Sequence, residues 1–131
     1  MKVYHQKNRP LSPHLTIYKP QLTSVLSIMH RLTGIGLFIG LLLVIIWFIG
    51  LSMGSGYFAV VEDLFQTIVI RFILVVSVWA LWYHVFAGIR HLVWDTGYGL
   101  DEKWINPSAY IVLVGSLCLT IFTLYQSWSI S

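Results

Sequence analysis

Three long runs of apolar residues divide the chain, and each is long enough to cross a membrane as a helix. They extend from Leu32 to Met53, from Phe72 to Ile89 with one interruption at His84, and from Trp104 to Ser131. A run of about 18 or more apolar residues is typical of a transmembrane helix. The pattern therefore predicts an all-α membrane protein in which three transmembrane helices form a single domain over residues 1–131. The expected bounds of the helices are about 24–53, 64–92 and 106–128.

Charged residues are few and unevenly placed. Of the 131 residues, 57% are hydrophobic and only 10% are charged, which is too apolar for a soluble domain. Seven of the eight basic residues precede the first run or bracket the gap between the second and third, namely Lys2, Lys7, Arg9, Lys19, Arg31, Arg90 and Lys103. The positive-inside rule then places the amino terminus and this gap in the cytoplasm and the carboxyl terminus in the periplasm. The basic residues do not alternate with aromatic residues as in a nucleic-acid-binding groove, which argues against nucleic-acid binding. The expected surroundings of the chain are membrane lipid.

Prolines and polar residues mark the expected ends of the helices. Pro10, Pro13 and Pro20 predict an irregular cytoplasmic arm over about residues 1–21. Thr23 or Ser24 is expected to cap the first helix. The segment Asn106–Ser108, with Pro107 at its centre, is expected to start the third helix. Trp94, Trp104 and Trp128 fall near helix ends, as interfacial anchors do.

The sequence also bounds the compartment and the redox chemistry. We expect no cleavable signal peptide, because the first apolar run begins past residue 30 and is too long for one. A bacterial inner membrane is favoured, with a mitochondrial inner membrane as the alternative. The single Cys118 lies in the third run, which excludes an intrachain disulfide and an iron–sulfur cluster held by this chain. Redox chemistry would therefore need a haem or a partner's cofactor.

His84 is the residue most in need of an explanation. It lies six residues before Arg90, which puts it about 9 Å inside the second helix from its cytoplasmic end. An imidazole at that depth can be a packing residue, a proton carrier or a metal ligand. His91 is two turns further along, about 10 Å away, so the two cannot ligate one iron. One of them can be axial while the other sits near the rim of a haem.

Polar residues also meet at the start of the first helix. Ser27 and Arg31 stand at i and i+4, so a hydroxyl and a guanidinium share one face that can bind a carbonyl group or a haem propionate. The alternative is that Arg31 extends to a lipid phosphate and that Ser27 donates to the backbone carbonyl four residues before it. His30 points about 100° away from Arg31 and is expected at the side of the same cavity. Asp95 follows the second helix, either as a proton guide or as a solvated loop carboxylate.

Three ordered motifs carry a resemblance to a known family. They are the stretch from Arg9 to Tyr18 (RPLSPHLTIY), the stretch from Ser27 to Gly34 (SIMHRLTG) and the stretch from His84 to His91 (HVFAGIRH) with Asp95 after it. Together they resemble the cytochrome b membrane-anchor subunits of succinate dehydrogenase, respiratory complex II. The resemblance covers the whole chain and includes the three-span layout.

The resemblance implies roles for individual residues. His84 would be the axial ligand, and hence the metal ligand, of one haem b shared with a second small anchor subunit. Ser27 and Arg31 would line the pocket for ubiquinone, and Arg31, His30 and His91 would lie near the haem propionates. The other partners would be a flavoprotein and an iron–sulfur subunit, in a heterotetramer that can trimerise further.

The implied function is that of a membrane subunit without catalytic activity of its own, in an oxidoreductase of the tricarboxylic acid cycle and respiratory chain. It would help to pass electrons from succinate oxidation to ubiquinone. One alternative is a purely structural anchor that contributes no haem ligand. Another is the anchor of a quinol:fumarate reductase, which has the same architecture and works in the opposite direction.

Overall fold

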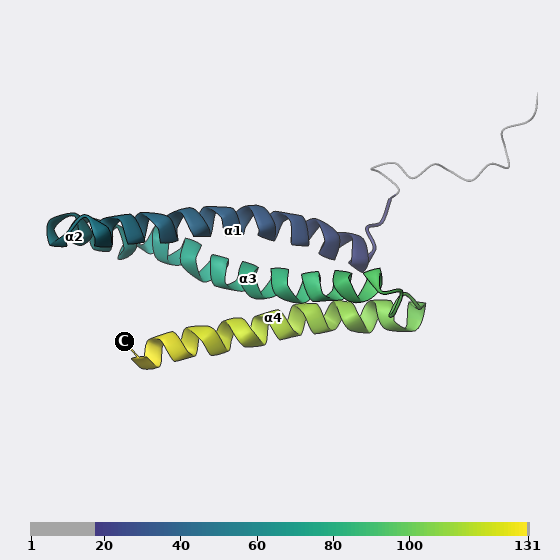
Figure 1. Cartoon of the computed structure of the whole chain (residues 1–131). Coiled ribbons are helices and arrows are strands. Elements are labelled where there is room, and N and C mark those ends of the chain that lie inside the picture. The colour runs from purple at the N-terminus through teal and green to yellow at the C-terminus, as the bar shows by residue number, and fades with distance from the viewer. Residues whose placement is uncertain (1–17, 131) are drawn as a thin grey trace, which may run out of the picture.

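Helices account for nearly all of the structure. The computed structural model describes residues 18–130, and these contain no strand. The four helices are α1 (Leu22–Ser52), α2 (Ser55–Phe65), α3 (Ile68–Asp95) and α4 (Glu102–Ile130) (Figure 1). Three segments are long and apolar enough to cross a membrane, namely Leu22–Ser52, Ile68–Asp95 and Lys103–Ser129. The prediction of an all-α protein with three membrane helices is confirmed.

Most of the predicted arm, with the motif from Arg9, lies outside the described residues. Residues 18–21 have no regular secondary structure, and Gln21 is extended. α1 then begins at Leu22, and no side chain caps it, so the prediction of a cap at Thr23 or Ser24 is wrong. The earlier start has a packing reason, because Leu22 contacts the buried core and helical geometry brings it there. Ser24 instead accepts a hydrogen bond from the Tyr18 hydroxyl, at 3.2 Å.

The start of α4 also differs from the expectation. The helix begins at Glu102, and Pro107 lies inside it instead of at its first position. The backbone amides of Trp104 and Ile105 donate to the carbonyl of Asp101, which begins the helix one turn early. Pro107 has no N–H, so one backbone hydrogen bond of the helix is lost, the one to the carbonyl of Lys103. This loss falls close to the amino-terminal end of α4.

The short helix α2 lies between the first and second membrane helices, where the sequence predicted no helix. Gly54, with a φ of 96°, ends the run of α1, and α2 carries the acidic residues Glu62 and Asp63 on its exposed surface. α2 lies against the end of α1, because a Cβ added at Gly50 would come within 2.7 Å of a Val61 methyl. α3 consequently begins at Ile68, later than the expected residue 64.

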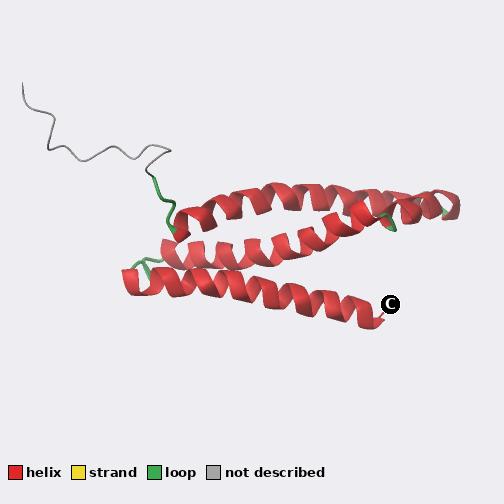
Figure 2. Cartoon of the chain, turned by 180° about the vertical axis from the view of Figure 1, so that it is seen from behind, coloured by secondary structure: helices red, strands yellow, loops and turns green. Residues whose placement is uncertain are grey.

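The three long helices pack side by side, with α3 between α1 and α4 along much of its length (Figure 2). The buried core gathers where α1 begins, α3 ends and α4 begins, and consists of Leu26, Tyr83, Ala87, Ala109 and Val112. Toward its carboxyl end α4 diverges from the other two helices (Figure 1). Most remaining apolar side chains are exposed, as expected for surfaces that contact lipid or other subunits.

Small residues allow the helices to approach closely. A Cβ at Gly40 would lie 2.8 Å from Oγ of Ser77 on α3, whereas a Cβ at Gly36 would meet nothing within 4 Å. Of these two glycines, only Gly40 therefore lies against a neighbouring helix. Between α3 and α4, Gly115 makes room for the ring of Phe86, since a Cβ there would lie 2.9 Å from Cζ.

Candidate functional site

Three imidazoles from α1 and α3 lie together near the buried core. The rings of His30 and His84 are stacked, with centroids 4.0 Å apart and planes inclined by 17°. The ring of His91 lies 5.3 Å from that of His30, at an angle of 48°. His30 thus contacts the other two, and the structure brings together all three histidines that the sequence singled out.

A glycine faces each of the two stacked rings from the opposite helix. A Cβ at Gly34 on α1 would lie 3.3 Å from Cε1 of His84, and a Cβ at Gly88 on α3 would lie 3.9 Å from Cε1 of His30. A larger side chain at Gly34 would push against the His84 ring, because 3.3 Å is already shorter than the optimum carbon–carbon separation of about 3.5–4.0 Å. The absence of a side chain at Gly34 therefore leaves the space that the His84 ring occupies.

Hydrogen bonds fix the orientation of His84. Its Nδ1 lies 3.1 Å from the backbone carbonyl oxygen of His30 and 3.3 Å from Oγ1 of Thr33. The Thr33 hydroxyl in turn donates to the same carbonyl, at 2.9 Å. A carbonyl oxygen can only accept, so Nδ1 of His84 carries the proton in this arrangement. The lone pair of the neutral ring is then on Nε2, which makes no hydrogen bond within the described residues.

This arrangement fits an axial ligand of a haem iron. Histidines that bind metals usually donate the other ring N–H to a carbonyl or carboxylate, which sets the tautomer and the ring orientation. His84 is half-buried, so its ring is not sealed inside the chain. The neighbouring ring of His30 is stacked on that of His84, with nearly parallel planes, so it is not placed on the opposite side of an iron bound to His84.

His30 contains the one buried polar side-chain atom that lacks a hydrogen bond among the described residues, its Nδ1. Buried polar atoms are nearly always paired in folded proteins, and an exception calls for an explanation. In this structure Nδ1 is covered by the chain itself, within the cluster of three imidazoles. The sequence placed His30 at the side of the cavity, and the structure places it in contact with both other histidines.

The remaining predicted site residues, Ser27, Arg31 and Asp95, have no polar partner among the described residues. Ser27 is half-buried and Arg31 is exposed, and neither forms a hydrogen bond or ion pair with another described residue. Their spacing of four residues still puts them on one face of α1, with His30 between them in the sequence. Asp95 is the last residue of α3, exposed and likewise unpaired within the described residues.

Two residues that sequence reasoning overlooked have clear roles in the structure. Thr33 is 4% exposed and joins the backbone of α1 to the imidazole of His84. Its spacing of three residues from His30 was the available signal, because that spacing lets a threonine bond the carbonyl of the earlier turn. Arg90, which the sequence used only as a marker of the cytoplasmic boundary, is 8% exposed and bonds across to α4.

The fold and the site together define a multi-pass membrane protein with a cluster of imidazoles between two of its helices. The family described as "Succinate dehydrogenase/Fumarate reductase transmembrane subunit" matches residues 5–123. The chain therefore belongs to this family, and the resemblance drawn from the three motifs is confirmed.

Individual relatives agree with this assignment. The succinate dehydrogenase cytochrome b556 subunit of Rickettsia conorii is 43% identical over 113 residues, covering 86% of this chain and 88% of that one. The subunit of the same name from Paracoccus denitrificans is 41% identical over 117 residues, covering 89% and 90%. The cytochrome b560 subunit of Reclinomonas americana is 40% identical over 114 residues, covering 81% and 77%. The bacterial relatives and the three spans support a multi-pass inner-membrane protein.

Proposed function

We propose that this chain is the cytochrome b anchor subunit of a succinate:quinone oxidoreductase and binds one haem b through Nε2 of His84. The observation that carries the proposal is the pair of contacts at Nδ1 of His84, which leave Nε2 available as a ligand. When bound, the haem would accept and release one electron at a time. A second ligand would come from a second small anchor subunit, because His30, the imidazole nearest to His84, is stacked on its ring and would not face the same iron from the other side.

The other residues of the imidazole cluster would hold the periphery of the haem. His30 is partly exposed as a residue and contacts both other imidazoles, which would bring its ring close to a propionate. Arg31 and His91 would add positive charge or further donors to the same carboxylates. Thr33 would keep the tautomer of His84 fixed as the charge at the iron changes, because its oxygen lies beside Nδ1.

Ser27 and Arg31 would bind the ubiquinone that receives the electrons. Reduction of the quinone to the quinol takes up two electrons and two protons, and negative charge develops on the ring oxygens when electrons arrive first. The guanidinium of Arg31 would stabilise that charge in a site of low dielectric constant, and the Ser27 hydroxyl would donate to one carbonyl oxygen. Both side chains are free of other polar partners within the described residues, as ligand-binding groups must be. Asp95, exposed at the end of α3, would pass protons toward this site.

The complex would also contain a flavoprotein that oxidises succinate to fumarate and an iron–sulfur subunit that delivers the electrons. The family description covers both succinate dehydrogenases and fumarate reductases, and the relatives reported above carry the name of the former. We therefore favour the direction from succinate to quinone. The distribution of basic residues favours an amino terminus in the cytoplasm and a carboxyl terminus in the periplasm. A reporter enzyme that works only in the periplasm should therefore be active when it is fused to the carboxyl terminus.

A difference spectrum tests the haem ligand. Membranes that contain the chain with its neighbouring subunits should show a reduced-minus-oxidised band of haem b, and His84→Leu should abolish the band or change its ligation while the complex still assembles. Val85→Leu, at the adjacent exposed position, is the matched control and should leave the band unchanged. An unchanged band in His84→Leu would move the ligand to another subunit and make this chain a structural anchor.

Two activity assays separate the quinone site from assembly. Ser27→Ala and Arg31→Leu should slow reduction of ubiquinone while succinate oxidation with an artificial electron acceptor continues. Arg71→Leu removes an exposed charge from the other end of α3 and should affect neither assay. Loss of both activities in the Ser27 and Arg31 variants would indicate failed assembly, and normal activity in both assays would refute their role.

A further inference from the structure

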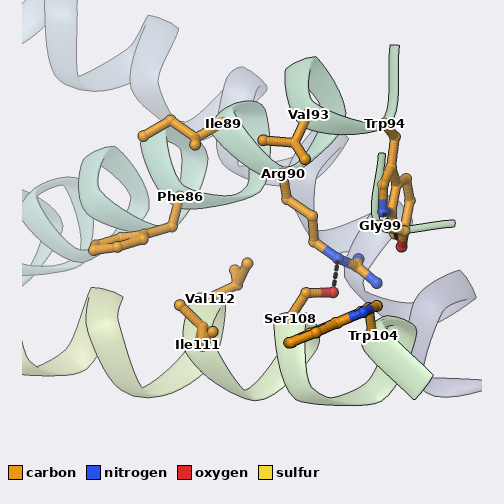
Figure 3. A pocket seen from close by; sticks show the side chains of 10 residues that line it. All are labelled: Phe86, Ile89, Arg90, Val93, Trp94, Gly99, Trp104, Ser108, Ile111 and Val112. Carbon is orange, nitrogen blue, oxygen red and sulfur yellow. Dashed lines mark hydrogen bonds between the residues drawn. The ribbon is translucent and has the colours of Figure 1, made fainter. Parts of the chain in front are cut away.

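A pocket between α3 and α4 lies beyond the imidazole site. It has a volume of about 340 Å³ and is formed where α3 ends and α4 begins (Figure 3). Phe86 and Ile89 from α3 and Ile111 from α4 line its apolar part, and Trp94 and Trp104 flank its other end. Ile89 and Ile111 are 52% and 62% exposed, so the apolar part is open along the outer surface of the helix pair.

Arg90 gives this pocket a charged end. The residue is only 8% exposed, although its side chain carries a full positive charge. Its Nε donates to Oγ of Ser108 at 2.8 Å and its Nη2 donates to the carbonyl oxygen of Ile105 at 3.1 Å. Cζ lies 3.9 Å from the centroid of the Trp94 ring. In Figure 3 the guanidinium lies between the two tryptophans and above Ser108.

The partners of Arg90 within the described residues leave three of its donors unused and its charge unpaired. A guanidinium has five N–H donors, and these two hydrogen bonds use only two of them. Both acceptors are neutral, and no carboxylate among the described side chains forms an ion pair with the group. Buried charges are normally paired with an opposite charge. The remaining donors therefore call for an anion from outside the chain.

The two ends of the pocket together specify the chemistry of that anion. A ligand that satisfies both must carry a negative, multidentate oxygen group and a long apolar portion. Arginine binds phosphate oxygens through two N–H groups at once, and tryptophans gather at the level of lipid headgroups. Basic pockets between transmembrane helices are sites for anionic headgroups. We propose that the pocket binds an anionic phospholipid, with its phosphate on Arg90 and an acyl chain along Phe86, Ile89 and Ile111.

The site does not depend on the haem. Arg90 and the apolar lining face α4, whereas the hydrogen-bonded histidines lie between α1 and α3. Lipid binding and haem binding can therefore fail separately. A complex with a normal haem spectrum and no bound lipid would refute only the lipid proposal.

Counting bound lipid tests the proposal on the complex purified with its neighbouring subunits. Native mass spectrometry after exchange into phosphatidylglycerol should show one more retained lipid in the wild type than in Ile111→Trp, which fills the apolar part of the pocket. Ile121→Trp places the same side chain at an exposed position of α4 outside the pocket and should retain the wild-type number. Equal retention in Ile111→Trp and the wild type would overturn the proposal.

A second variant tests the charge. Arg90→Gln keeps an amide donor for Ser108 but removes the cation, and should weaken retention of phosphatidylglycerol about tenfold in a titration with lipid vesicles. Phosphatidylcholine should compete poorly with phosphatidylglycerol in the wild type, and inorganic phosphate should not displace it. Equal binding of both lipids would show that Arg90 does not select an anionic headgroup, and would contradict the proposal. A photo-crosslinker at Ile111 that reacts with a neighbouring subunit instead of lipid would show that protein fills the pocket.

Discussion

The space that Gly34 leaves for the ring of His84 gives the sharpest prediction. A Cβ at this position would lie 3.3 Å from Cε1, and carbon atoms in contact prefer about 3.5–4.0 Å. In Gly34→Ala the ring would thus need to move by a few tenths of an ångström. In Gly34→Val two further methyl groups extend about 1.5 Å beyond the Cβ, into the volume of the ring.

The expected effects follow from that overlap. Overpacking of this kind costs about 1–3 kcal/mol. If the ring can bind haem only in its present position, the same energy appears as a loss of haem affinity of about 5–150-fold in Gly34→Val. Gly34→Ala should retain haem with a shifted spectrum, because the ring can tilt only by lengthening the 3.1 Å bond between its Nδ1 and the His30 carbonyl.

The measurement is the amount of haem per purified complex, together with the reduced-minus-oxidised spectrum. Gly36→Val is the matched control, because a Cβ at Gly36 meets nothing within 4 Å and the residue lies on the same helix. It should keep the full haem content. Full haem and an unchanged spectrum in Gly34→Val would refute the reasoning. Equal losses in the two valine variants would mean that α1 is disturbed as a whole.

Three further variants test single contacts. Thr33→Val should raise the midpoint potential of the haem by about 20–40 mV in a redox titration, because one acceptor beside the ligand imidazole is lost, whereas Thr33→Ser should not. Tyr83→Phe should lower the thermal stability of the complex by about 0.5–1.5 kcal/mol through loss of the 3.0 Å bond to the Leu26 carbonyl, and unchanged stability would contradict the contact. Gly115→Ala should also destabilise, because its Cβ would lie 2.9 Å from the Phe86 ring, and adding Phe86→Leu should restore stability measured in the same way.

The sequence predicted the helices well because lipid imposes a simple rule. A span must be long and apolar, so the three runs could be read directly, and the basic residues supplied an orientation. The residues at which the helices begin were harder to predict. Whether Leu22 joins α1 depends on its contact with the core, and whether the segment before Pro107 is helical depends on the carbonyl of Asp101. Both are contacts that a local pattern of residues does not reveal.

Some residues of the candidate site could also be predicted from the sequence, and others could not. Motif positions singled out His30, His84 and His91, and the structure brings them together. The role of Thr33 could not be read from the sequence, because it depends on the register of α1 against α3. Arg90 looked like a surface charge, since its partner Ser108 lies 18 residues away on another helix. The roles of Ser27, Arg31 and Asp95 stay predictions.

The bonds from Arg90 to α4 also set an order of events during synthesis. The buried guanidinium of Arg90 needs hydrogen-bond acceptors, and the two that this chain supplies, Ser108 and the carbonyl of Ile105, both belong to α4. At about 5–20 residues per second, the ribosome adds Ser108 about 1–4 s after Arg90. During that interval the two hydrogen bonds from Arg90 to α4 cannot form. The second and third spans are therefore best understood as one hairpin that enters the bilayer together, once its last partner has been made.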